Sequence, residues 1–120
     1  MLGHCPNMRD VYQALDLLVQ SSDYEGTPTV VVEAMASGIP IVATDAGGTS
    51  QLAIPNHHAL IVPCGDTDAI ADAAIRAIRD VKSTEARVAA SRQRACTELT
   101  FQYRLTKLTD IYEAIARSLV

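Results

Sequence analysis

The chain alternates between short apolar runs and longer segments in which apolar residues recur every three or four positions. The runs at 16–20, 39–44 and 58–63 have the length and composition of buried strands, and Leu2 and Gly3 resemble the end of a further strand. Segments with helical spacing separate and follow these runs, at residues 8–15, 28–37, 49–53, 67–81, 84–99 and 101–119. The pattern therefore predicts strands that alternate with helices.

Cap and turn residues mark the ends of the predicted helices. Pro28 fits the first helical position with Thr27 as the cap, and Gly38 fits the helix end. Asp66 or Thr67 would cap the helix that follows the third strand. The apolar face of that later helix should cover one face of the sheet, and it comprises Ile70, Ala74, Ile75, Ile78 and Val81.

The predicted strands are too apolar to have one face in water, which indicates a parallel sheet covered by helices on both sides. The fold class is therefore α/β, a partial Rossmann-like, doubly wound sheet with helices at the C-terminal end. We expect residues 1–120 to form a single domain. Right-handed crossovers would place the loops at 21–28 and 45–51 along one sheet edge, where such sheets bind ligands.

Composition narrows the function. The chain has 120 residues and a net charge of -4, and its ten Lys and Arg residues are scattered among few aromatics, so we expect no nucleic-acid partner. The three cysteines lie far apart without a C-x-x-C pair, which favours a reducing, cytoplasmic setting over a disulfide framework or a zinc site. His57 and His58 would point to opposite sides of the chain, which disfavours a shared metal. The final stripe at 101–119 fits a core helix better than a membrane anchor.

The stretch E-G-T-P-T-V-V-V-E carries the candidate chemistry, because Glu25 and Glu33 lie eight positions apart across a loop and a helix start. A helix that begins here leaves the amides of Thr29, Val30 and Val31 without intrahelical partners, and these amides can bind an anion. Gly26 lacks a side chain at the closest approach, so a diphosphate could lie against the backbone. A helix start of this kind is common, so the anion site by itself is a weak indication.

The surroundings of Glu33 are more informative, since its helix is apolar almost all round and should be buried. A buried carboxylate needs partners, and the vicinal diol of a ribose would supply them, while Glu25 could accept bonds from sugar hydroxyls. Gly47 and Gly48 would form a second position at which the backbone can lie close to a ligand. Each of these residues also has a purely structural alternative. Glu25 could be a loop acid that interacts favourably with the helix dipole, and Glu33 could be a buried partner of Arg9 or of a backbone group. The two glycines could simply form a turn.

The order and spacing of these parts resemble the donor-binding half of retaining glycosyltransferases of the GT-B fold, the glycosyl transferases group 1 or family 4. The E-x(7)-E motif of that family corresponds to Glu25 and Glu33, and the next elements read I-P-I-V-A-T-D-A-G-G and A-L-I-V-P-C-G-D. Upstream, L-G-H and V-Y-Q-A-L-D-L-L-V-Q-S-S match the preceding elements, and Phe101 and Tyr112 fit the C-terminal helices. The resemblance covers practically the whole chain.

The resemblance implies transfer of a sugar from a nucleotide-diphosphate sugar to an acceptor with retention of configuration, by a hexosyl-type transferase (EC 2.4) that needs no metal and no cofactor. Glu25 would be the catalytic-site residue that touches the donor sugar, and Glu33 would hold the ribose. The donor-binding residues that it implies are Glu25, Gly26, Thr27, Pro28, Thr29, Val30, Glu33, Gly47 and Gly48.

The chain also departs from the family pattern. It begins at what would be the third strand of the C-terminal domain, so we expect a truncated domain that is inactive alone and lacks the basic phosphate-binding loop. An N-terminal acceptor domain would belong to the same or another chain, and the full enzyme could associate peripherally with a membrane. Gln51 stands where many relatives have Glu, and residues 56–58 replace a Gly-containing turn. The alternative is a non-catalytic α/β nucleotide-binding or interaction module, with self-association through an exposed sheet edge.

Overall fold

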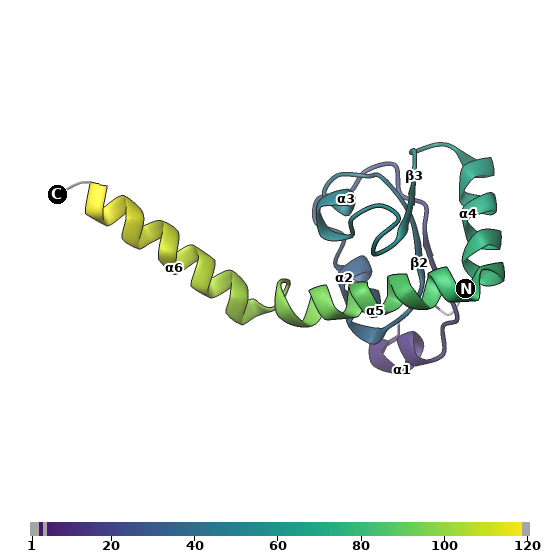
Figure 1. Cartoon of the computed structure of the whole chain (residues 1–120), viewed down its shortest axis with the longest axis horizontal. Helices are drawn as coiled ribbons and strands as arrows, with labels where there is room; N and C mark the ends of the chain where they lie inside the picture. Colours follow the sequence, from purple (N-terminus) through teal and green to yellow (C-terminus); the bar gives the residue numbers. More distant parts are fainter. Residues whose placement is uncertain (1–2, 4, 119–120) are drawn as a thin grey trace.

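The computed structural model describes residue 3 and residues 5–118, and it consists of six helices and three strands in that part of the chain. The predicted strand end at Leu2 lies outside the described residues, and Gly3 is not in a strand. The elements run in the order α1 (Met8–Gln13), β1 (Leu18–Gln20), α2 (Thr29–Ser37), β2 (Ile41–Thr44), α3 (Thr49–Leu52), β3 (Leu60–Val62), α4 (Thr67–Arg79), α5 (Val81–Thr97) and α6 (Phe101–Ser118) (Figure 1).

The three strands form one parallel sheet in the order β1-β2-β3, which confirms the predicted α/β fold class. Val42 at the centre of β2 pairs with Val19 on one side and with Leu60 on the other. Each strand is shorter than the apolar run that predicted it. In β2 the reason is Pro40, which has no amide hydrogen for the ladder and contributes only its carbonyl, to the amide of Leu18.

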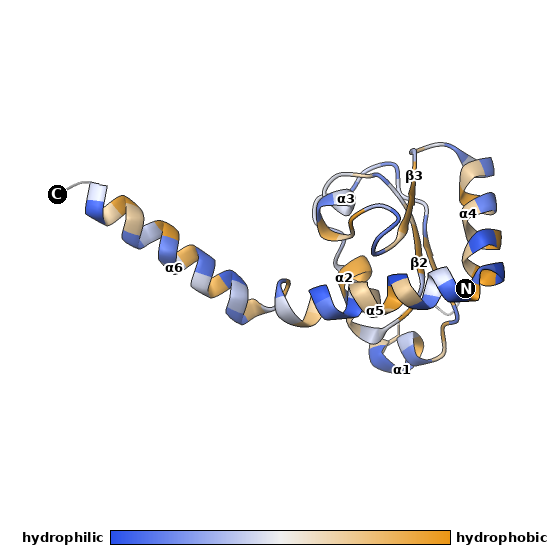
Figure 2. Ribbon diagram, viewed as in Figure 1, coloured by the Kyte–Doolittle hydropathy of each residue, from blue (hydrophilic) through white to orange (hydrophobic). Residues whose placement is uncertain are grey.

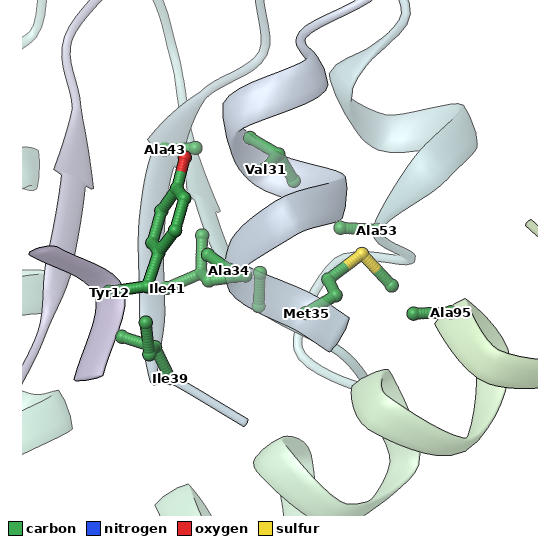
Figure 3. Close-up of a cluster of buried hydrophobic side chains, with 10 residues drawn as sticks. Tyr12, Val31, Ala34, Met35, Ile39, Ile41, Ala43, Ala53 and Ala95 are labelled. Carbon is green, nitrogen blue, oxygen red and sulfur yellow. The ribbon is translucent and has the colours of Figure 1, made fainter. Parts of the chain in front are cut away.

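Helices cover both faces of the sheet, as the apolar strands predicted. All four residues of β2 are buried, and alternate ones point to opposite faces. Ile41 and Ala43 belong to the larger core cluster, in which Met35 of α2 lies toward Ala53 and Ala95 (Figure 3). Val42 faces the other way, into a smaller cluster with Leu60 and Ala77. The first cluster lies under α1, α2 and α5, and the second lies under α4.

The boundary between α4 and α5 differs from the prediction. Asp80 ends α4 and caps α5, accepting a hydrogen bond from the amide of Ser83 at 3.2 Å, so Val81 begins the next helix instead of extending the α4 face. The buried side of α4 is formed by Ile70, Ala73 and Ala77, which are spaced by three and four positions. Ile75 and Ile78 lie on the flank of this stripe and are exposed, and their assignment to the core was wrong.

Helix α6 also departs from the prediction, because it extends away from the rest of the molecule (Figure 1) and buries none of its residues. Its apolar residues therefore belong to no core in the described structure, and blue and orange residues alternate along it (Figure 2). The helical periodicity was correct, but the expected burial was not. No helix of the described residues is long and apolar enough to cross a membrane.

Candidate functional site

The candidate site lies at the sheet edge where the parallel strands end. The loop at 21–28 follows β1, the loop at 45–48 follows β2, and the two are held together by the strand ends. The hydroxyl of Thr44, the last residue of β2, donates to the carbonyl of Ser22, and the thiol of Cys64 lies 3.8 Å from the same oxygen. Pro28 at the far end of the first loop is fully buried. The predicted juxtaposition of these two loops is therefore confirmed.

Glu25 is half-buried in the first loop and its carboxylate is held by two neighbours. Its Oε1 accepts a hydrogen bond from Nε2 of Gln20 at 2.8 Å and another from Oγ of Ser22 at 2.7 Å. Gln20, the last residue of β1, is 8% exposed, which fixes its amide group. No described residue donates to Oε2 of Glu25, so this oxygen can accept hydrogen bonds from a ligand. Gln20 was not predicted to take part in the site, and Ser22 was predicted only as part of the loop at 21–28.

Gly47 allows the two loops to touch. Its φ is +55°, and a Cβ at this position would lie 1.8 Å from the backbone oxygen of Glu25. The amide of Gly48 donates to the carbonyl of Gly26 at 3.3 Å. The backbone of Glu25 thus fills the space beside Gly47. The sequence had instead predicted that a ligand would lie close to the backbone there. The glycine pair instead supports the loop that carries Glu25.

The start of α2 differs in detail from the prediction. Pro28 has a non-helical ψ of 87° and occupies the cap position, so the helix begins at Thr29 and Thr27 does not cap it. The amide of Val31 donates to the carbonyl of Pro28 at 3.1 Å and is not available to a ligand. The amides of Thr29 and Val30 belong to the first turn and have no described partner. Two amides, not three, are therefore left free at the positive end of the helix dipole.

Glu33 is exposed, which corrects the expectation that it is buried. The buried face of α2 consists of Val31, Ala34 and Met35, and a rotation of about 100° per residue places Glu33 on the opposite side. Its partner is neither Arg9 nor a backbone group. The hydroxyl of Tyr12 in α1 donates to Oε2 of Glu33 at 2.6 Å.

Tyr12 is only 5% exposed, and no motif in the sequence indicates that it belongs to the site. Burial, the hydrogen bond to Glu33 and the negative charge of Glu33 together raise the pKa of Tyr12 to about 12, and burial is the largest of these causes. The phenol is therefore protonated at neutral pH and remains a donor. It fixes one oxygen of Glu33 and leaves Oε1 able to accept hydrogen bonds from a ligand.

A pocket of about 540 Å³ opens beside Glu33, between α2 and the beginning of α6. Thr27 and Thr29 line it on the α2 side, and Arg104 and Lys107 line it on the α6 side. Glu25 does not line this pocket, so the two acids do not share it. No group of three or more His, Cys, Asp or Glu in the described part of the chain is arranged to hold a metal ion.

Comparison with known proteins gives this geometry a context. The chain is 32% identical over 118 residues to the lipopolysaccharide core biosynthesis mannosyltransferase LpsB of Rhizobium meliloti (strain 1021). The matched region covers 97% of this chain and 34% of the relative. It therefore spans about a third of the length of that protein.

Two solved structures resemble the fold closely. The C-terminal domain of the glycosyl transferase group 1 family protein LpcC from Francisella tularensis gives a TM-score of 0.74 at 25% identity, covering 83% of this chain and 53% of that one. Anabaena Alr3699/HepE in complex with UDP gives a TM-score of 0.73 at 26% identity, covering 89% of this chain and 29% of that one. Residues 1–94 match the family described as Glycosyl transferases group 1, and the chain belongs to that family.

Proposed function

We propose that this chain supplies part of the donor site of a glycosyltransferase that moves a sugar from a nucleotide-diphosphate sugar to an acceptor with retention of configuration. The observation that carries the proposal is the pair of oriented carboxylates, Glu25 and Glu33, on either side of the two unpartnered amides that begin α2. Hydroxyl groups of a donor could bond to the acids, and its diphosphate could bond to the amides.

The free oxygen of each acid supports a role for it. Glu33 keeps Oε1 for a ribose hydroxyl while Tyr12 holds Oε2. Glu25 keeps Oε2 for a hydroxyl of the donor sugar, beside the reacting carbon. The backbone from Gly26 to Val30 would face the sugar and the diphosphate, and open space lies where a Cβ of Gly26 would stand. No metal and no cofactor has a part in this arrangement.

The similarity to a structure solved with UDP supports a nucleoside diphosphate as the ligand class. The acceptor and its binding domain belong to a further part of the same protein or to another chain. The cysteines described as free fit the reducing, cytoplasmic setting that we propose for the enzyme.

Titration calorimetry with UDP and GDP tests the donor site. We expect weak binding to the wild-type chain and binding about tenfold weaker in Glu33→Gln, because the charged acceptor of the ribose hydroxyl is lost. Glu85→Gln is the matched control, since Glu85 is exposed on α5 and lines neither of the pockets that the structure describes. Equal affinity in Glu33→Gln and the wild type would remove the role given to Glu33.

The exposed apolar face of α6 supports a second candidate, a non-catalytic module that acts through contact with another protein. The same titration separates the two candidates. No heat with either nucleotide, from a chain whose fold is verified by circular dichroism, would favour the interaction module over the donor site.

A further inference from the structure

A second pocket, of about 380 Å³, lies at the corner where α4 gives way to α5. Its walls are Asn56 and His57, from the loop before β3, and Ser83, Ala86 and Arg87 of α5. None of these residues lines the pocket beside Glu33. Because residues 56 and 57 precede β3, this pocket lies toward the opposite end of the sheet from the loops that follow the strands. It is therefore separate from the proposed donor site.

Arg87 is the unusual feature of this pocket. The residue is 8% exposed, and its one hydrogen bond within the described structure runs from Nη2 to Oγ1 of Thr84 at 2.7 Å. The hydroxyl of Thr84 in turn donates to the carbonyl of Ala77 at 2.8 Å. The ion pairs found among the described residues do not include Arg87. A guanidinium has five N–H donors, and a buried charge without a carboxylate partner is costly.

The charges around Arg87 favour an anion. Arg76 of α4 stands at the rim and donates to Oδ1 of Asn56 at 3.3 Å. Burial lowers the pKa of Arg87 and the nearby charge of Arg76 lowers it further, while Asp80 acts in the opposite direction. The carboxylate of Asp80 is engaged in capping α5, where it accepts from the amide of Ser83. Two guanidinium groups thus face one acid already in use, in a chain whose net charge is -4.

We propose that the pocket formed by Asn56, His57, Ser83, Ala86 and Arg87 binds a phosphate-class oxyanion, held chiefly by the guanidinium of Arg87. The planar fork of an arginine matches two oxygens of a phosphate, and partial burial strengthens such charge-assisted bonds. Arg76 adds a second positive charge at the rim. Asp80 opposes the binding of a doubly charged anion, so the affinity is modest.

Two-dimensional NMR of the amides, with increasing inorganic phosphate at constant ionic strength, tests the proposal. The amides of Asn56, His57, Ser83 and Ala86 should shift together and saturate, whereas sodium chloride should leave them in place. The same spectra report on Thr29 and Val30 at the start of α2. A phosphate response confined to Thr29 and Val30 would contradict this second site and leave the proposed donor site intact, so the two ideas fail separately.

Three variants sharpen the test. Arg87→Gln should weaken phosphate binding by about tenfold, because it removes a charge-assisted pair of bonds. Arg76→Gln should weaken it by about threefold through loss of the rim charge, and it keeps the test valid if Arg87→Gln does not fold. Arg79→Gln is the matched control, since Arg79 is exposed and lines neither described pocket. Equal dissociation constants in the wild type and in Arg76→Gln and folded Arg87→Gln would overturn the proposal.

A parallel titration with methyl phosphate distinguishes the sources of the anion. Tighter binding of methyl phosphate than of inorganic phosphate assigns the pocket to the phosphate group of a phosphorylated metabolite. The reverse order assigns it to free phosphate. Either order supports the site, and absence of a response at residues 56, 57, 83 and 86 with both probes argues against it.

Discussion

At the scale of single residues, Gly47 allows the loop after β2 to contact the backbone of Glu25, because it has no side chain. We expect Gly47→Ala to lower the free energy of unfolding by more than about 2 kcal/mol, because the new Cβ would meet the backbone oxygen of Glu25 at 1.8 Å. Gly65→Ala is the control, since Gly65 has a similar φ of +76° but open space around it, so only backbone strain of about 1 kcal/mol applies. Urea unfolding measures both changes. Equal losses in the two variants would show that the contact between the loops does not matter.

Gly26 provides the opposite case, in which a substitution should change binding but not stability. Apart from the two chain neighbours of Gly26, no described residue has an atom within 4 Å of where its Cβ would stand. We expect Gly26→Ala to change the free energy of unfolding by less than about 0.5 kcal/mol. If the diphosphate lies against this backbone, the added methyl group should weaken UDP binding by about tenfold, because it forces the ligand away from its bonds. Unchanged affinity in a calorimetric titration would place the ligand elsewhere.

Tyr12 should reveal its contact with Glu33 through its titration. Its pKa is raised to about 12 from an ordinary value of 10.0, so the folded state keeps a proton that the unfolded state has lost between these values. Stability from Tyr12 is therefore fully present below pH 10 and is lost as the pH rises toward 12. We expect Glu33→Gln to lower the pKa of Tyr12 without restoring the ordinary value, because burial is the larger cause.

Ultraviolet absorbance of the tyrosinates as a function of pH measures this pKa, and Tyr12→Phe identifies the step that belongs to Tyr12. If Glu33→Gln leaves that step at the same pH as in the wild type, the hydrogen bond between the two side chains does not persist in solution.

The sequence predicted part of this site. The spacing of Glu25 and Glu33 and the glycines around them were sufficient to find the loop and the helix start. The contacts that orient the acids were not found, because Tyr12 is 21 positions from Glu33 and lies in a separate helix, the one predicted at residues 8–15. Gln20 reaches Glu25 only once β1 has placed its last side chain under the loop. Such partners depend on the packing of separate elements, which local spacing does not encode.

At the scale of elements, helix caps have measurable consequences. Oδ1 of Asp66 accepts a hydrogen bond from the amide of Ala69 at 2.9 Å, as predicted for the start of α4. We expect Asp66→Ala to destabilise the protein by about 1 kcal/mol, since an amide at the helix start loses its partner. Asp72→Ala, in the exposed middle of the same helix, should change stability by less than half as much. Thermal unfolding of the two variants checks this, and equal shifts in Tm would contradict a capping role for Asp66.

Element boundaries were harder to predict than element types. Asp80 looked like a polar residue inside one helix because the apolar spacing continues as far as Val81. In the structure its carboxylate instead caps a new helix, and the chain changes direction there. A capping aspartate and a solvent-facing aspartate have the same local pattern. The choice between them depends on whether α5 can pack against α2, which it does.

At the scale of the whole molecule, apolar periodicity predicted the parallel sheet and its two covered faces but not the position of α6. A stripe along a helix shows that one face is apolar, and it does not show what covers that face. For α4 the sheet covers the stripe. For α6 no described part of the chain does, and residues such as Leu108 and Ile111 remain 45% and 55% exposed.

The exposed apolar stripe of α6 has consequences for stability and for association between copies of the chain. We expect Leu108→Glu to leave the free energy of unfolding within about 0.5 kcal/mol of the wild type, because α6 buries no residue of its own. Met35→Ala, at a position with no exposed surface, should cost about 2–5 kcal/mol by opening a cavity in the core. The contrast would show that α6 is attached to the folded unit without stabilising it.

An uncovered apolar helix face favours association between copies, so the wild-type chain should show a mass that rises with concentration in sedimentation equilibrium. Leu108→Glu introduces a charge into the stripe and should reduce that rise. Thr106→Glu adds the same charge on the other side of α6, about 160° around the helix from Leu108, and should leave the association unchanged. Equal association in both variants would move the contact to the exposed edge of β1, where Val19 is 46% exposed and no strand among residues 5–118 pairs with the outer side of the backbone.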